Sequence, residues 1–209
     1  MMTSPMICWR RVGAAALLAV ATAALAGCAA QSTPANRYTL PETVSPRQVT
    51  DPAPQARQLA VSPVEVASYL DQEGIVMQTS DIELNAANQN LWAEELRNQL
   101  TRRLRQSLAA DLPGVTVVST ARSDASAQRL TLSVEQFQGR YDGQAVASGE
   151  WQLHENGRLT AQQHFSVTRP LGDDGYPALV HALGGVWEEV AQQVAQGIRT
   201  ASLASPTAE

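Results

Sequence analysis

Leucine recurs every four positions between residues 91 and 110, which predicts an amphipathic helix there. The stripe consists of Leu96, Leu100, Leu104 and Leu108. Asn90, just before it, is a residue type that favours a helix N-cap. A second apolar stripe through residues 176–200 predicts another helix, in which Gly184 and Gly185 would allow a kink or the close packing of a neighbour.

Alternation of apolar and polar residues predicts extended strands over most of the remaining chain. These strands cover 58–70, 75–84, 115–120, 128–143 and 144–167. Asn156-Gly157 is a strong hairpin signal in the last of them, and a change of phase near Gln136 indicates a β-bulge. The pattern predicts an α+β domain with a mostly antiparallel sheet and two amphipathic helices packed on one face.

The first residues carry the signs of an export signal. Arg10 and Arg11 precede an Ala-rich apolar run, residues 12–27, which is short for a membrane span. The run ends in Leu25, Ala26, Gly27 and Cys28. Taken alone, Cys28 could be a nucleophile, a metal ligand, half of a disulfide or an attachment point.

The order Leu-Ala-Gly-Cys matches the bacterial lipobox, in which signal peptidase recognises residues 25–27. Cleavage before Cys28 would leave its thiol linked to a diacylglycerol and its amine acylated, a firm anchor. The alternative is an ordinary secretory signal with an incidental cysteine. Cys8 would leave with the signal, so disulfide scaffolds, thiol catalysis and thiolate metal sites are excluded. Ala29 follows in place of Asp, which favours the periplasmic leaflet of the outer membrane.

Composition divides the rest of the chain. Residues 28–57 are rich in Pro, Ala and Ser and predict a tether, in which residues 37–40 are short enough to add an edge strand. Residues 58–202 form the expected domain and residues 203–209 a flexible tail. Subtracting twenty acidic side chains from the thirteen arginines left after cleavage gives −7. An acidic chain with scattered Arg is a poor binder of nucleic acid.

Candidate chemistry is sparse. His154 and His164 flank the predicted hairpin turn and could meet across it as a two-histidine metal site, but both fall on its polar face. His181 has no suggested partner. No nucleophile elbow or phosphate loop is present. We therefore expect no catalytic residue, no metal and no cofactor besides the lipid on Cys28.

Five segments together resemble the auxiliary lipoproteins of ABC-type and MCE-type lipid transport systems, in particular the Pqi type. They are "VSPVEVASYLDQEGIVMQTSDIEL" (61–84), "NQNLWAEEL" (88–96), "GRYDGQ" (139–144), "SGEWQL" (148–153) and "DGYPALVHAL" (174–183). The resemblance implies a non-enzymatic outer-membrane lipoprotein that supports envelope integrity. Its partner would be a periplasm-spanning MCE-domain protein, and a homo-oligomeric ring of the chain would match a tubular partner.

Two departures from the family pattern bear on docking. Glu95 stands where relatives often have Pro, and the loop from Tyr69 through Asp71 ends in Gln-Glu where many relatives have Arg-Pro. If that loop contacts the partner, docking would differ in detail. Tyr69, Asp71 and Tyr141 are the predicted contact residues, whereas Trp92 and Trp187 on helix stripes are expected in the core. The competing hypothesis is an outer-membrane scaffold or activator of a cell-wall enzyme or secretion complex.

Overall fold

The structure, a computed structural model, describes residues 34–42, 57–123 and 127–204. The chain divides into two units, Met1–Pro34 and Ala35–Glu209, and every described residue except Pro34 belongs to the second. Its strands are β1 (Asn36–Tyr38), β2 (Arg57–Val61), β3 (Glu65–Val66), β4 (Gly74–Gln78), β5 (Leu84–Trp92), β6 (Val115–Ser119), β7 (Gln128–Arg140), β8 (Gln144–Glu155) and β9 (Arg158–Pro170). Its helices are α2 (Leu96–Asp111) and α3 (Tyr176–Ala204), with short 3₁₀ turns at Ser68–Leu70 and Thr120–Arg122.

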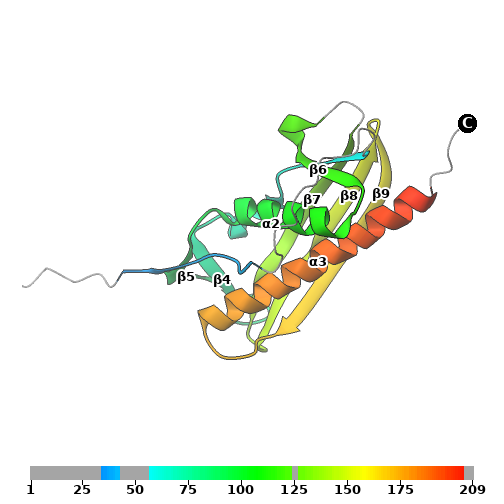
Figure 1. Ribbon diagram of the computed structural model, residues 1–209. Coiled ribbons are helices and arrows are strands. Elements are labelled where there is room, and N and C mark those ends of the chain that lie inside the picture. The colour runs from blue at the N-terminus through cyan, green and yellow to red at the C-terminus, as the bar shows by residue number, and fades with distance from the viewer. Residues whose placement is uncertain (1–33, 43–56, 124–126, 205–209) are drawn as a thin grey trace, which may run out of the picture. The chain divides into compact units, whose positions relative to one another are not determined.

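Three long strands, β7, β8 and β9, form one side of the sheet, with β9 at its edge, and each runs antiparallel to the next (Figure 1). The predicted hairpin is confirmed: Asn156 and Gly157 both have positive φ, as a tight two-residue turn requires. The predicted bulge is also confirmed, because the β7–β8 register shifts between Val134 and Gln136.

On its other side, β7 pairs in parallel with β2, β3 and β4 in succession. The predicted α+β class is therefore confirmed, but the sheet is mixed rather than mostly antiparallel. Residues 57–78 act as one interrupted strand along β7. Pro63 has no backbone N–H to donate, so pairing stops between β2 and β3. Residues 67–73 then loop out before β4 begins.

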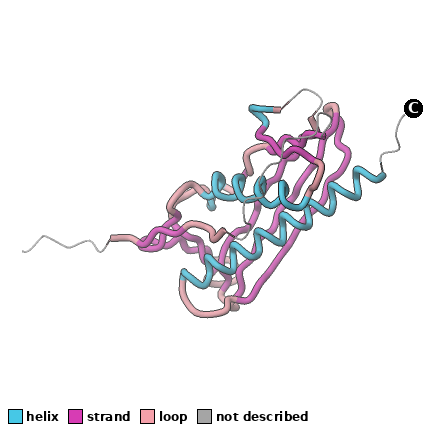
Figure 2. The backbone as a smooth tube through the Cα atoms, in the orientation of Figure 1, coloured by secondary structure: helices cyan, strands magenta, loops and turns pink. Residues whose placement is uncertain are grey.

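Both helices lie on one face of the sheet, as predicted (Figures 1 and 2). α3 packs along β9, β8 and β7, and α2 packs against α3 and β6. The leucine stripe of α2 is fully buried, and Trp92, Trp151 and Trp187 are 2–3 % exposed. Phe137 joins two of these rings, edge-on to Trp187 at 5.9 Å and tilted to Trp92 at 6.4 Å. None of the described helices is both long and apolar enough to cross a membrane.

The start of the first predicted helix is wrong. Residues 84–92 form strand β5, and α2 begins only at Leu96. Asn90 is not an N-cap: its side chain accepts a hydrogen bond from the Tyr38 hydroxyl at 3.1 Å. β5 is paired on both sides, by β1 and by β4. These tertiary pairings outweigh the local preference of Asn for helix ends.

Part of the predicted tether belongs to the folded unit. Residues 36–38 pair in parallel with β5, and Leu40 is only 2 % exposed. The expected edge strand at 37–40 therefore exists as β1, one residue earlier and shorter. The predicted signal peptide with Cys28, residues 43–56 of the tether, and residues 205–209 of the tail lie outside the described residues.

Candidate partner-binding surfaces

The histidines do not form a site. The β8–β9 register places His154 opposite Leu159 and His164 opposite Glu150, so the two imidazoles do not face each other across the hairpin. His181 is exposed on α3. Within the described ranges, no cluster of three or more His, Cys, Asp or Glu side chains could hold a metal ion.

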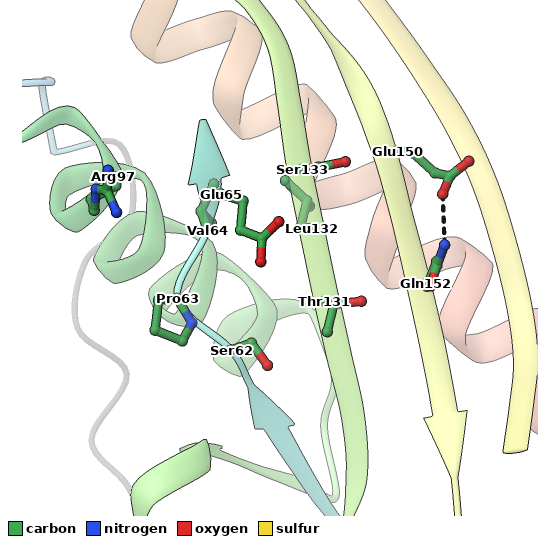
Figure 3. Close-up of a pocket in the computed structure, with 10 residues that line it drawn as sticks. All are labelled: Ser62, Pro63, Val64, Glu65, Arg97, Thr131, Leu132, Ser133, Glu150 and Gln152. Carbon is green, nitrogen blue, oxygen red and sulfur yellow. Dashed lines mark hydrogen bonds between the residues drawn. The ribbon is translucent and has the colours of Figure 1, made fainter. Parts of the chain in front are cut away.

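A groove of about 510 Å³ opens where the strand line along β7 is interrupted. Figure 3 shows it on the sheet face turned away from α3, with Glu65 reaching from β3 toward β7. Its walls come from residues 62–65, β7, β8 and the start of α2. Most of the side chains that line it are polar: Ser62, Glu65, Arg97, Thr131, Ser133, Glu150 and Gln152. Such a lining offers several hydrogen-bond partners to a polar protein surface.

Glu150 is held in a fixed position beside this groove. Gln162 donates to its carboxylate at 2.7 Å and Gln152 donates at 2.8 Å. The hydrogen bond from Gln162 lowers the pKa of Glu150 most, and the one from Gln152 lowers it next. Partial desolvation raises the pKa and opposes them, while the charge of nearby His164 lowers it slightly further. The groove therefore presents an oriented, ionised carboxylate, with His164 Nε2 at 3.2 Å.

The loop of residues 67–73 carries two of the three predicted contact residues. Tyr69 is half-buried, and its hydroxyl oxygen lies 2.7 Å from both the Glu135 carbonyl oxygen and Gln138 Oε1. Burial, with a smaller contribution from the Glu135 charge, raises the pKa of Tyr69 to about 12. Asp71 is exposed and forms an ion pair with Arg97. Because Arg97 also lines the groove, loop and groove form one continuous surface.

Tyr141, the third predicted contact, lies on a different element, the β7–β8 turn, where it is 59 % exposed. The structure brings it to the same end of the sheet as Ile82 and Leu84, which the sequence pattern placed on one face of the predicted strand 75–84. Ile82 is 90 % exposed and Leu84 is 44 % exposed. Their alternation with Asp81 and Glu83 predicted a strand through residue 84, but β4 ends at Gln78, and residues 79–83 form a turn that leaves Ile82 exposed.

The N-terminal segment pairs with β5 at residues 36–38, and Leu40 and Pro41 then contact the two helices. Leu40 donates its backbone N–H to buried Gln99 at 2.9 Å, and Arg103 donates to the Leu40 carbonyl at 2.6 Å. Pro41 packs on α3 where Gly184 has no side chain: a Cβ there would lie 2.6 Å from Pro41 Cγ. The neighbour that packs closely on Gly184, as the sequence predicted, is thus Pro41 of the chain's own N-terminal segment. We call residues 36–41 the strap.

The similarity to known proteins extends over most of the folded unit. Residues 38–195 match the family described as "ABC-type transport auxiliary lipoprotein component". The chain is 39 % identical over 184 residues to the intermembrane transport lipoprotein PqiC of Escherichia coli K12, covering 88 % of this chain and 96 % of the relative. The Shigella flexneri protein of the same name matches equally.

Two solved structures share the fold. The crystal structure of an uncharacterised protein has a TM-score of 0.70 and 34 % identity, covering 79 % of this chain and 99 % of that one. A protein from Xanthomonas campestris has a TM-score of 0.65, covering 81 % and 97 %, and its 21 % identity speaks for the fold alone.

Proposed function

The chain belongs to the family of ABC-type transport auxiliary lipoprotein components, and we propose that it is the non-catalytic accessory subunit of a Pqi-type MCE lipid transport system. The observation that carries this proposal is the 39 % identity to an intermembrane transport lipoprotein over almost the whole of both chains. An identity of this extent covers the strap, the sheet and both helices rather than a single motif.

The proposal places the protein in the periplasmic leaflet of the outer membrane. Its anchor is a diacylglycerol and an N-acyl chain on Cys28, after cleavage at the Leu25-Ala26-Gly27 recognition sequence. Ala29 in place of Asp supports outer-membrane retention. Most of the side chains that line the groove are polar, which supports a subunit that docks on the lipid carrier instead of enclosing lipid itself.

The docking surface that we propose for a periplasm-spanning MCE-domain protein is the groove together with the 67–73 loop. Glu65, Asp71 and Glu150 give it an acidic character, partly balanced by Arg97. A partner segment with basic and amide side chains would match it, and its approach would be steered by charge. If the partner is a tube with cyclic symmetry, a ring of this chain would repeat the same contact around it.

Site-specific photocrosslinking tests the docking surface. A photoreactive residue at exposed Glu65 should crosslink to a co-expressed MCE-domain protein, whereas the same residue at exposed His181, on the outer side of α3, should not. Mass spectrometry of the membrane-extracted chain should show acylation at Cys28. Capture of a cell-wall enzyme instead of an MCE-domain protein would favour the scaffold hypothesis and overturn this one. Native mass spectrometry of the acylated chain would give the copy number.

A further inference from the structure

The exposed large apolar side chains of the described residues gather at one end of the sheet. Ile82, Leu84 and Tyr141 lie there, and the remaining one, Leu159, lies at the opposite end beside the β8–β9 turn. The register explains the clustering: Gln78 of β4 pairs with Leu84 on one side and with Arg140 on the other. We call Ile82, Leu84 and Tyr141 the apolar tip.

β1, the first part of the strap, runs away from the end of the sheet that carries the tip. β1 runs parallel to β5, with Asn36 opposite Asn90. Followed backwards, β1 therefore leads toward the start of β5 at Leu84, six positions from Asn90 or about 20 Å away. Cys28 precedes Asn36 by eight positions, which span at most about 28 Å when fully extended. A lipid on Cys28 thus has enough chain to reach the tip, with little to spare.

The size and charge of the tip decide what could cover it. Three side chains are too few for a stable protein interface, which buries roughly 800 Å² on each partner. They suffice for shallow contact with the headgroup region of a bilayer. Asp81, Glu83 and Asp142 are chain neighbours of the tip residues, and the guanidinium of Arg140 is paired with Asp142 at 2.7 Å. This charge suits a zwitterionic leaflet and disfavours an anionic one.

We propose that the apolar tip rests in the headgroup region of the leaflet that holds the protein's own anchor. This inference deepens the proposed function, since it rests on attachment through Cys28. The acyl chains on Cys28 supply the affinity for the membrane, and the apolar tip orients the folded domain on it. With the tip against zwitterionic phospholipid, the strap holds the domain close to the membrane, and the Asn156-Gly157 end of the sheet points away from it.

Quenching of tryptophan fluorescence by brominated lipid tests the contact. The chain from Cys28 to Glu209 keeps every described residue and has a single thiol, so a maleimide phospholipid can anchor it whether or not cells acylate it. Trp92, Trp151 and Trp187 are buried and quench little. On vesicles of brominated phosphatidylcholine, we expect Ile82→Trp to be quenched about threefold more than the control Leu159→Trp. Both positions are exposed, so both variants should fold.

Equal quenching at the two positions, or none at residue 82, would overturn the membrane contact even if Cys28 acylation and partner capture both hold. Replacing part of the phosphatidylcholine by phosphatidylglycerol should reduce quenching at residue 82, and an increase would contradict the charge argument. If Ile82→Ser with Leu84→Ser abolishes capture of an MCE-domain protein while Leu159→Ser does not, the tip is a protein-docking surface and the proposal is wrong.

Discussion

The two faces of the β7–β9 sheet are built from alternating residues of the same strands, yet different interactions hold them: apolar packing on one face and side-chain hydrogen bonds on the other. Along β7, Leu130, Leu132 and Val134 are buried under the helices, while the residues between them, Thr131 and Ser133, face the open groove. The covered face is close-packed: a Cβ at Gly197 of α3 would lie 2.3 Å from the ring of Trp151. The open face is held by hydrogen bonds between side chains.

This difference separates stability from recognition. Substitutions on the covered face remove packing and leave cavities, so they should change the free energy of unfolding strongly. Substitutions on the open face remove hydrogen bonds that water can replace, so they should change partner binding with little effect on stability. The four predictions below test this separation, beginning with the largest expected effect.

Trp187→Ala should be the most destabilising of these changes. Trp187 contacts Phe137 edge-on, and its indole N–H donates to the Leu100 carbonyl at 3.1 Å, which joins α3 to α2. Removing it should lower the free energy of unfolding by about 3–5 kcal/mol, measured by urea denaturation. Trp187→Phe, which keeps a ring but loses the hydrogen bond, should cost less. Equal stability of Trp187→Ala and the parent would show that the covered face is not the core.

Leu40→Ala tests whether the strap belongs to the covered side. Leu40 is buried between the helices, so the substitution should cost about 2–4 kcal/mol and should expose residues 36–41 to limited proteolysis. Thr39→Ala, at the exposed neighbouring position, is the control and should change neither measurement. A strap that becomes protease-sensitive without any loss of stability would instead be an independent appendage.

Periodic patterns predicted the covered face well and the segment boundaries poorly. The leucine stripe of α2, the Asn156-Gly157 turn and the bulge before Gln136 are local signals, and each is confirmed. β5 was missed because "LNAANQNLW" has few β-formers, and its strand state depends on pairing with β1 and β4. Parallel pairing along β7 is equally non-local, since no short-range pattern records which strand lies beside which.

The predicted contact residues illustrate the same limit. Turn-adjacent positions and the family resemblance marked Tyr69, Asp71 and Tyr141 as candidates. They could not show that Tyr69 turns its hydroxyl inward while Tyr141 remains exposed. The groove itself was not predicted, because it depends on where Pro63 interrupts pairing beside β7. The burial of these side chains, and the residues that lie beside them, depend on how the strands assemble into the sheet.

Tyr69→Phe lies between the two faces and should have an intermediate effect. Losing the contacts of the hydroxyl with Glu135 and Gln138 should cost about 1 kcal/mol. The pKa of Tyr69 is about 12 in the folded chain against about 10 when unfolded, so its contribution is complete below pH 10 and is lost as the pH rises toward 12. The parent should therefore lose stability over that range more steeply than the variant. Parallel curves from urea denaturation at each pH would refute this assignment.

Glu150→Gln should have the smallest effect on stability and is the sharpest test of the open face. The pKa of Glu150 is lowered chiefly by the amides of Gln162 and Gln152, so its stabilising contribution is present above the unfolded pKa of about 4.3. That contribution is lost as the pH falls through the lower folded pKa. At neutral pH, solvent screening leaves little net stability in these hydrogen bonds.

The Glu150→Gln variant should therefore match the parent in urea denaturation at neutral pH. In acid, it should lack only the additional loss of unfolding free energy that the parent shows as Glu150 becomes protonated. It should nevertheless reduce the yield of partner crosslinks from Glu65, because it removes a charge from the groove. If Glu150→Gln instead destabilised the chain as much as Trp187→Ala, the open face would be part of the core, and the division between the two faces would fail.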